Sequence, residues 1–213
     1  MRGGAVAVTG TLVTICAAAL AFSAWRPDRS AAATPPPVSS QTAPKGHRIF
    51  LTRAQLRQAI ASGTFDRPVE SLLEVHAPLR FGDYEWDDRG VPAGPTWMRV
   101  DLNSQMMSVF RGRHEIGTAV IVYGADGLPT PIGKFPILAK LKDHRSAAYD
   151  APMPFTLRLT SDGVSIHASS VRWGAATHGC IGIPLPFAER LFAATNVGDE
   201  VEIVGSRQPA KKS

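Results

Sequence analysis

Cysteine is scarce in this sequence, since 213 residues contain only Cys16 and Cys180. Cys16 lies in an apolar N-terminal run and Cys180 lies near the other end, so no framework of paired cysteines exists. Charged residues are also few, at 19%, whereas hydrophobic residues make up 44%. This composition excludes wholesale disorder, a coiled coil and collagen, and the length suits one ordinary domain with extensions.

Several motifs of common enzyme classes are absent. Neither GxGxxG nor a Walker A stretch occurs, so a nucleotide-binding loop is not expected. His114-Glu115 begins like the helix of a zinc protease, but Thr118 occupies the position of the second histidine. No serine is followed three residues later by lysine and GxSxG is missing, which argues against serine acyl-enzymes. The chemistry that remains is built on cysteine.

The net charge of +5 belongs to the two ends of the chain. Residues 1–45 carry a net charge of +3 and so do residues 206–213, whereas residues 46–205 sum to −1. A basic face that binds phosphates is therefore not indicated. We expect the central segment to bind nucleic acid negligibly at physiological salt.

The N-terminal run over residues 3–25 contains no charged residue. As a helix it would reach roughly 34 Å, enough to cross a bilayer. It is either a secretory signal, with Ala31-Ala32-Ala33 as the cleavage site, or an uncleaved membrane anchor with Trp25 at the interface. In both cases the rest of the chain is expected to be exported. Residues 26–46 are rich in proline, alanine and serine and are typical of a linker.

Two helical segments are expected next. Thr52 and Gln55 form a capping box, and Gly63 is placed to end the helix that follows. Pro68 opens a possible second helical turn over residues 70–75.

From residue 97 onward the pattern is typical of β-strands. Met98, Val100 and Leu102 alternate with the residues between them, and residues 103–104 form a turn. The elements expected after that turn are strands at 106–110, 116–122 and 163–167, a helix at 187–194 and a last strand at 201–204. The predicted fold class is therefore mainly β with few helices.

Cys180 lies within thirteen residues of two histidines, His167 and His178, and directly follows Gly179. A free thiol with a pKa of about 8.5 is only slightly ionised at neutral pH, and a neighbouring histidine can raise the thiolate fraction. His167 ends an expected strand, so its side chain can project from a sheet edge. Gly179 lets the backbone approach a substrate and offer N–H groups to an oxyanion. A nucleophile, a base and an oxyanion-binding loop thus lie in one short segment.

Two other interpretations of these residues stay open. A single cysteine is often a small buried apolar residue, and a histidine in a strand is often a packing residue. However, an exported protein gains little from an unpaired thiol that can oxidise. His167, His178 and Cys180 could instead bind zinc, although a fourth ligand or water is needed and no CxxC or HxH spacing supports it.

The segment Thr177-His178-Gly179-Cys180, following a histidine in a strand, resembles the signature of the L,D-transpeptidase catalytic domain of bacterial cell-wall enzymes. A second motif of that family, a Thr-Pro-x-Gly-x-Phe loop, matches residues 130–135. The resemblance covers about residues 96–205 and implies an L,D-transpeptidase-like β-sandwich or barrel domain. This sequence departs from the family in two ways, because Gly182 stands where Arg or Asn is usual and only twelve residues separate His167 from Cys180.

The resemblance implies an acyltransferase of peptidoglycan synthesis, with a role in cell wall biogenesis and cell shape. Cys180 is then the nucleophile that attacks the stem peptide and releases D-alanine. His167 is the proton donor and acceptor, oriented by the carbonyl of Ala168. His178 supports the thiolate or the loop, and the backbone of Gly179 stabilises the oxyanion. An amine on a neighbouring stem completes the cross-link, and no metal or organic cofactor is needed.

Substrate contacts are less sharply defined by the sequence. Tyr149 and Phe155 lie upstream of the motif histidine and either line the substrate cleft or pack in the core. Arg172 or Arg158 could supply the polar group that Gly182 lacks.

Two alternatives to the transpeptidase remain. Water in place of the acceptor amine gives an L,D-carboxypeptidase, and a non-catalytic cell-wall-binding module could keep the fold without the chemistry. The expected partners are peptidoglycan stem peptides and, if the N-terminal segment is uncleaved, the membrane. The expected location is the periplasm or the outer face of the cytoplasmic membrane of a bacterium.

The expected segments are a signal peptide or anchor (1–25), a linker (26–46), an N-terminal preface (47–95), a catalytic domain (96–205) and a basic tail (206–213).

Overall fold

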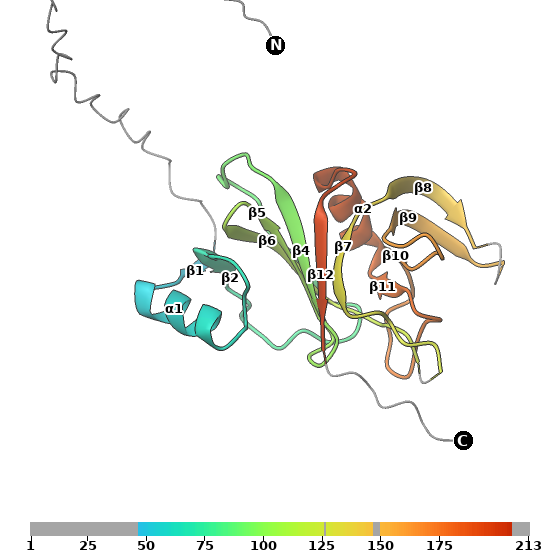
Figure 1. Cartoon of the computed structure of the whole chain (residues 1–213), viewed down its shortest axis with the longest axis horizontal. Coiled ribbons are helices and arrows are strands. Elements are labelled where there is room, and N and C mark those ends of the chain that lie inside the picture. Colours follow the sequence, from blue (N-terminus) through green and yellow to red (C-terminus); the bar gives the residue numbers. More distant parts are fainter. Residues whose placement is uncertain (1–46, 126, 147–149, 206–213) are drawn as a thin grey trace, which may run out of the picture. The chain divides into compact units, whose positions relative to one another are not determined.

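The computed structural model describes residues 47–125, 127–146 and 150–205. The expected export segment, linker and basic tail, together with Tyr149, lie outside the described residues. In the described part of the chain, twelve strands form two sheets, and two helices accompany them (Figure 1). The prediction of a mainly β fold with few helices is confirmed. Neither helix of these described residues is long and apolar enough to cross a membrane.

The larger sheet has the strand order β1-β2-β6-β5-β4-β12-β7, with β3 paired to β6. Its strands are β1 (Arg48–Phe50), β2 (Ser71–Leu73), β3 (Tyr84–Trp86), β4 (Thr96–Asp101), β5 (Met106–Arg111), β6 (His114–Val120), β7 (Gly133–Pro136) and β12 (Glu200–Val204). Two pairs in this sheet run parallel, β2 with β6 and β4 with β12, and the others run antiparallel.

The smaller sheet has the strand order β11-β10-β9-β8. Its strands are β8 (Ala139–Arg145), β9 (Pro152–Arg158), β10 (Ser165–Ala168) and β11 (Ile181–Ile183). The β10 and β11 strands run parallel, and the other two pairs are antiparallel. Helix α2 (Leu185–Ala194) follows β11 and contacts β9 and β10. Residues of α2 and of both sheets share the main hydrophobic core.

The alternating pattern from residue 97 onward produces the β4–β5 hairpin. Met98 and Val100 are fully buried, and so are Met107 and Val109 on the other strand. The register pairs Met98 with Val109 and Val100 with Met107, so these side chains face the core together. The turn expected at residues 103–104 lies between the two strands, as predicted.

Helix α1 (Arg53–Ala61) begins where the capping box was expected. The amide of Gln55 donates to the Thr52 hydroxyl at 3.3 Å, and the amide of Thr52 donates to the Gln55 side chain at 2.9 Å. Gly63, with a φ of 73°, follows the end of the helix in a conformation that favours glycine. Since no residue of α1 is buried, this helix lies at the surface of the preface.

The helical turn expected over residues 70–75 is wrong, because β2 occupies this segment. Ser71 and Leu73 are buried whereas the residue between them is half-buried, which is the period of a strand. The amide of Leu73 donates to the buried carboxylate of Glu115 at 2.8 Å, and β2 pairs with both β1 and β6. These long-range partners override the local helix signal that Pro68 gives.

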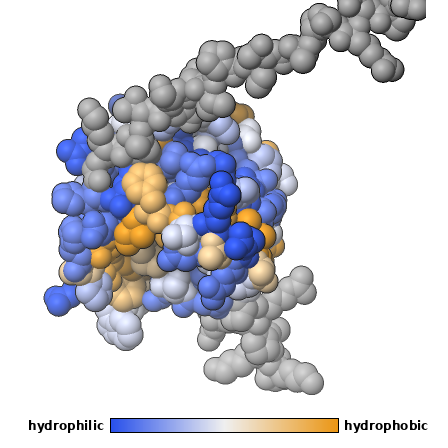
Figure 2. All heavy atoms as spheres, turned by 90° about the vertical axis from the view of Figure 1, so that its left-hand side faces the viewer, coloured by the Kyte–Doolittle hydropathy of each residue, from blue (hydrophilic) through white to orange (hydrophobic). Residues whose placement is uncertain are grey.

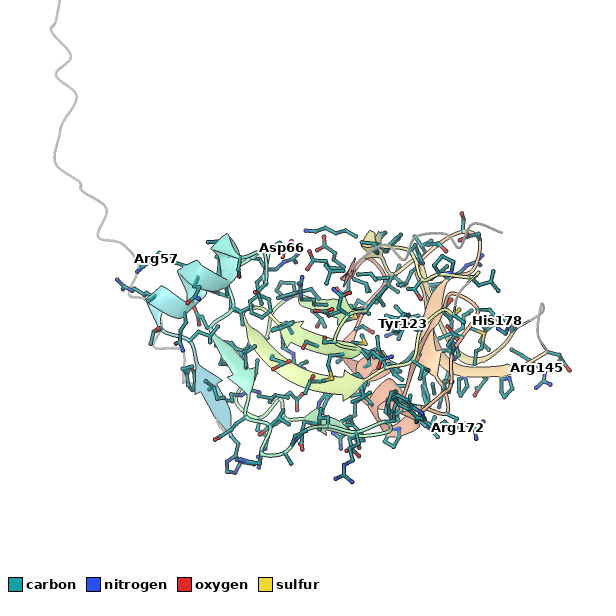
Figure 3. All side chains as sticks on the ribbon, turned by 90° about the horizontal axis from the view of Figure 1, so that it is seen from below. Arg57, Asp66, Tyr123, Arg145, Arg172 and His178 are labelled. Carbon is teal, nitrogen blue, oxygen red and sulfur yellow. The ribbon has the colours of Figure 1, made fainter. Side chains whose placement is uncertain are left out.

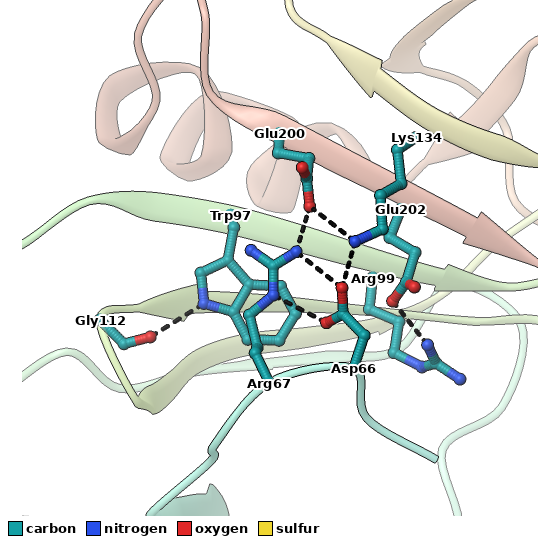
Figure 4. A network of polar contacts seen from close by, with 8 residues as sticks. All are labelled: Asp66, Arg67, Trp97, Arg99, Gly112, Lys134, Glu200 and Glu202. Atoms are coloured by element: carbon teal, nitrogen blue, oxygen red, sulfur yellow. Dashed lines mark hydrogen bonds and ion pairs between the residues drawn. The ribbon is translucent and has the colours of Figure 1, made fainter. Parts of the chain in front are cut away.

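A cluster of charges attaches the preface to the strands that follow it (Figure 4). The Nε atom of Arg67 donates to Asp66 at 2.7 Å, and its guanidinium also pairs with Glu200 of β12. Lys134 of β7 pairs with Asp66 and lies 3.7 Å from Glu200. The hydrogen bond from Arg67, helped by Lys134, holds the pKa of Asp66 well below its usual range. Opposite charges from three parts of the chain thus meet at one point.

Trp97 lies beneath this cluster. The guanidinium carbon of Arg67 lies 4.5 Å from the Trp97 ring centroid, a cation–π contact. The indole ring stacks on Phe110 with a centroid separation of 4.1 Å and an angle of 8°. Its Nε1 atom donates to the carbonyl of Gly112 at 2.8 Å. Trp97 therefore joins the preface to β4 and β5.

Apolar side chains of the core and of the surface differ sharply in exposure. Phe187 of α2 is fully buried, with the rings of Tyr84 and Trp86 at 5.8 and 5.4 Å. On β1, in contrast, Ile49 is 49% exposed and Phe50 is 51% exposed. Figure 2 looks towards this side of the molecule and shows apolar atoms grouped among hydrophilic ones.

Replacing Phe187 with alanine is expected to lower the free energy of unfolding by about 3–5 kcal/mol, because a cavity forms in the core. The matched control is Phe50→Ala, which removes the same ring from a half-exposed position and is expected to cost about 1 kcal/mol or less. Urea unfolding of both variants measures the difference. Equal losses in the two variants would contradict this assignment of the core.

Candidate active site

The parallel pairing of β10 and β11 brings His167 and Cys180 to one edge of the smaller sheet. The register pairs His167 with Gly182, so Cys180, two residues earlier, comes level with Ser165. The backbone amide of Ser165 hydrogen-bonds the Cys180 sulfur, in agreement with this register. The thiol therefore lies near the start of β10, the strand that carries His167.

The turn that leads into Cys180 is stabilised by a hydrogen bond from Thr177, the first residue of the turn. The hydroxyl of Thr177 donates to the carbonyl of Cys180. Gly179 has a φ of 101°, in the left-handed region that favours glycine, and it is buried. The amide of Thr177 donates to the carbonyl of Tyr123 at 3.0 Å. The turn is therefore fixed both internally and to the segment that follows β6.

The loop over residues 130–135 starts against the same turn. The amide of Gly124 donates to the Thr130 hydroxyl at 2.9 Å. A Cβ atom on Gly124 would lie 2.1 Å from the Leu128 carbonyl oxygen and 3.0 Å from the Cα of Gly179. This close approach requires glycine at position 124. The two motifs recognised in the sequence are thus neighbours in space.

Gly182 joins the smaller sheet to the segment that follows β6. Its carbonyl accepts from the amide of Val122 at 3.0 Å, and its amide donates to the carbonyl of Val122 at 2.8 Å. A Cβ atom at this position would lie 2.7 Å from Val122 Cγ2 and 2.8 Å from Ser169 Cβ. This packing leaves no room for the Arg or Asn side chain expected from the family pattern.

Cys180 is half-buried and its thiol faces two backbone groups of the smaller sheet. The sulfur lies 3.8 Å from the carbonyl oxygen of Gly163, to which the thiol donates a weak hydrogen bond. Burial raises the pKa of the Cys180 thiol, and the amide of Ser165 opposes this shift by a smaller amount. The resting form of the side chain is therefore the thiol.

His167 is buried and its ring is held by the backbone. Its Nδ1 atom lies 2.8 Å from the carbonyl oxygen of Ala168. Because a carbonyl only accepts, Nδ1 carries the proton and Nε2 is left with a free lone pair. This contact is the orienting one that the resemblance implied. Burial lowers the pKa of His167, and the nearby His144 lowers it further, so the ring is neutral at neutral pH.

The other candidate residues differ in their exposure and in their contacts. His178 and Arg172 are exposed, and Figure 3 shows them on separate parts of the surface. Phe155 is half-buried, has a φ of 55° and packs edge-to-face on Phe192 of α2 at 5.6 Å. Arg158 donates to the carbonyls of its own turn, Thr160 and Ser161. Substrate contacts of Arg172 and Phe155 stay predictions.

The alternative zinc site is not supported in the described part of the chain. The ligand atoms of His167, His178 and Cys180 do not form a group within 4.8 Å of one another there. The turn instead separates an exposed His178 from a buried His167.

Sequence reasoning missed two features of this site. The first is His144, which is half-buried on β8 and acts electrostatically on His167. The second is the backbone around Gly163 and Ser165, which contacts the sulfur. No local pattern indicates either one, because both depend on how β8, β9, β10 and β11 pair.

The pH dependence of alkylation tests the resting state of Cys180. In a Cys16→Ser background, the rate with iodoacetamide is expected to rise with an apparent thiol pKa above the ordinary value of about 8.5, because burial disfavours the thiolate. The same protein unfolded in urea is the control and should titrate at the ordinary value. A rate that is already constant at neutral pH would reveal a preformed thiolate–imidazolium pair and contradict this description.

Residues 95–203 match the family model YkuD, described as the L,D-transpeptidase catalytic domain. L,D-transpeptidase 1 of Mycobacterium tuberculosis is 28% identical over 123 residues, which cover 50% of this chain and 49% of that protein. The chain therefore spans about half the length of the curated relatives it matches.

Two solved structures of L,D-transpeptidases also match the chain. The crystal structure of L,D-transpeptidase (Yku) from Stackebrandtia nassauensis matches with a TM-score of 0.50 and 22% identity, over 71% of this chain and 65% of that chain. That of L,D-transpeptidase 1 from Mycobacterium tuberculosis matches with a TM-score of 0.47 and 25% identity, over 52% of this chain and 62% of that chain. The fold prediction is confirmed, and the family model covers just over half of the sequence. The chain belongs to the YkuD family of L,D-transpeptidase catalytic domains.

Proposed function

We propose that this protein is an L,D-transpeptidase that acts on peptidoglycan stem peptides through an acyl-enzyme on Cys180. The observation that carries the proposal is the pairing of β10 with β11, which brings the Cys180 sulfur to the start of β10, the strand that carries His167. A half-buried thiol at the start of the strand that carries a buried, backbone-oriented imidazole is the arrangement that we expect of a cysteine nucleophile and its base. A packing cysteine has no need of it.

The first half-reaction transfers the acyl group to the enzyme. The proton of the Cys180 thiol moves to Nε2 of His167 as the sulfur attacks the carbonyl carbon of the third stem residue, a diamino acid. A sulfur–carbon bond forms and the carbonyl oxygen becomes an oxyanion. When the tetrahedral intermediate collapses, the bond to the terminal D-alanine breaks. His167 returns its proton to the leaving amine, and a thioester remains on Cys180.

The second half-reaction transfers the acyl group to an acceptor amine. His167 takes a proton from the amine as it attacks the thioester carbonyl, and the sulfur leaves as the amide bond forms. Return of the proton to the sulfur restores the resting thiol. The electrons and protons balance without any further co-reactant.

The turn before Cys180 is proposed to stabilise the oxyanion. The proposed donors are the backbone N–H groups of Gly179 and Cys180, in the turn where Gly179 has a φ of 101°. Loss of one such donor typically costs about 2.7–4 kcal/mol in transition-state stabilisation. His178 is exposed and adjoins this turn, so its proposed role is to support the loop.

Burial explains why the pair is neutral at rest. The pKa of Cys180 is raised and that of His167 is lowered, so a separated thiolate and imidazolium are disfavoured before substrate binds. Charge then develops only as the sulfur attacks, where the turn can stabilise it.

The reaction also requires residues 47–205 to reach the cell wall. We propose that the N-terminal segment over residues 1–25 directs this export.

Intact mass spectrometry of the protein with stem tetrapeptide tests this function. The expected result is a mass increase that equals the acyl tripeptide, together with one free D-alanine per adduct. Adding an amine acceptor should remove the adduct and give the cross-linked product. Release by water alone would identify an L,D-carboxypeptidase, and no adduct under any condition would contradict the proposal.

Three variants test the separate roles proposed for Cys180, His167 and His178. Cys180→Ser should abolish turnover, because a serine hydroxyl needs far stronger base assistance than a thiol. His167→Ala should lower the rate by about 10²–10⁴-fold and recover partly at high pH, where solvent ionises the thiol unaided. His178→Ala should cost less than His167→Ala. If His178→Ala is the more damaging change at every pH, the base is the other histidine.

A further inference from the structure

A group of metal-ligating side chains lies in the preface, away from Cys180. Its members are His47, Glu74 and His76, and their ligand atoms all lie within 4.8 Å of one another. All three residues are exposed to solvent. We propose that this group is a binding site for a divalent transition-metal ion of the Zn²⁺ class.

The pairing of β1 with β2 explains why these residues meet. The register pairs Arg48 with Leu73, and the amide of Glu74 donates to the carbonyl of His47 at 3.0 Å. His47 and Glu74 are therefore directly opposite each other. His76 follows Glu74 by two residues, the spacing that returns to the same side of an extended chain.

The backbone that carries these ligands is anchored to the body of the protein. Arg48, the neighbour of His47, is buried and donates to the carbonyls of Glu115 and Asp87. Leu73, the neighbour of Glu74, donates to the carboxylate of Glu115 at 2.8 Å. The strands that present His47 and Glu74 are thus fixed, and only exposed side chains need to adjust.

The surroundings leave these side chains available to an ion. The imidazoles of His47 and His76 contact each other edge-to-face, with centroids 5.4 Å apart. Among the described residues, the Glu74 carboxylate forms no ion pair, whereas the nearby Asp87 is already paired with Arg89 at 2.9 Å. The three side chains line a depression of about 330 Å³, which also contains Glu85 and Arg190. The negative charge of the Glu74 carboxylate is therefore available to an ion in that space.

The donor set selects the class of ion. Two imidazole nitrogens and one carboxylate oxygen suit Zn²⁺ and its neighbours, with water in the remaining position, whereas Mg²⁺ and Ca²⁺ prefer oxygen ligands alone. A tetrahedral zinc site with bonds of about 2.0–2.2 Å needs ligand atoms about 3.3 Å apart. Rotation of exposed side chains already within 4.8 Å of one another can reach this spacing.

Metal binding here would hold the two ends of the segment from His47 to Glu74 together. Glu74 lies 27 residues after His47, and α1 lies between them. An ion held by both ends of this segment binds only when β1 and β2 are paired, so it stabilises their pairing by mass action. The site would therefore act on stability and not on the chemistry at Cys180.

Isothermal titration of the full chain with Zn²⁺ tests the proposal, with Mg²⁺ as the control ion. One Zn²⁺ per chain is expected to bind saturably and to raise the unfolding temperature, and Mg²⁺ should do neither. Glu74→Gln should weaken Zn²⁺ binding by about tenfold or more, because it removes a ligand. Glu85→Gln is the matched control: it makes the same change in the same depression outside the ligand group, and binding should be unchanged.

Cys180→Ser separates this site from the catalytic residues. Retention of Zn²⁺ binding in that variant supports the preface site, and its loss would place the ion at the thiol and overturn the proposal. Equal weakening by Glu74→Gln and Glu85→Gln would show attraction by charge alone and overturn it too. Absence of saturable Zn²⁺ binding to the unaltered protein would have the same consequence.

Discussion

The two hydrogen bonds between Val122 and Gly182 form a backbone bridge between β11 and the segment that follows β6, immediately beyond the turn that carries Cys180. The bridge requires a residue without a side chain, because a Cβ atom on Gly182 would collide with Val122 and Ser169. Gly182 is also the partner of His167 in the β10–β11 register. One glycine therefore connects the strand that follows Cys180 to the strand of His167 and to the segment that follows β6. The departure from the family pattern at this position is a packing requirement of this chain.

The electrostatics of the site follow from this placement. Burial raises the pKa of Cys180 and lowers that of His167. Backbone groups then provide the orientation that a charged partner would otherwise provide, through the carbonyl of Ala168 and the amide of Ser165. The charged contacts are elsewhere, where Arg67 and Lys134 connect the preface to β12 and β7 (Figure 4). The protein separates the groups that hold it together from the groups proposed to react.

Local patterns predicted the elements that local physics controls. The capping box at Thr52, the alternation from Met98 to Leu102 and the glycine-containing turn before Cys180 each specify their own structure. The β2 strand was mistaken for a helical turn, because its pairing with β1 and β6 is invisible to a short window. The roles of His144 and Gly182 and the meeting of His47 with Glu74 and His76 were missed for the same reason. Each depends on strands that are distant in sequence.

Gly182 positions Cys180 because only a residue without a side chain fits against Val122 and Ser169. The most direct measurement compares D-alanine release from stem tetrapeptide by Gly182→Ala and by Gly94→Ala. A Cβ atom at Gly94 would meet nothing nearer than 3.6 Å, so this control adds the same methyl group without a collision. Gly182→Ala is expected to lower turnover by about 10²-fold, because a small displacement of the proposed nucleophile is costly, whereas Gly94→Ala should keep full turnover. A Gly182→Ala protein that is as active as the unaltered one would contradict this role of Gly182.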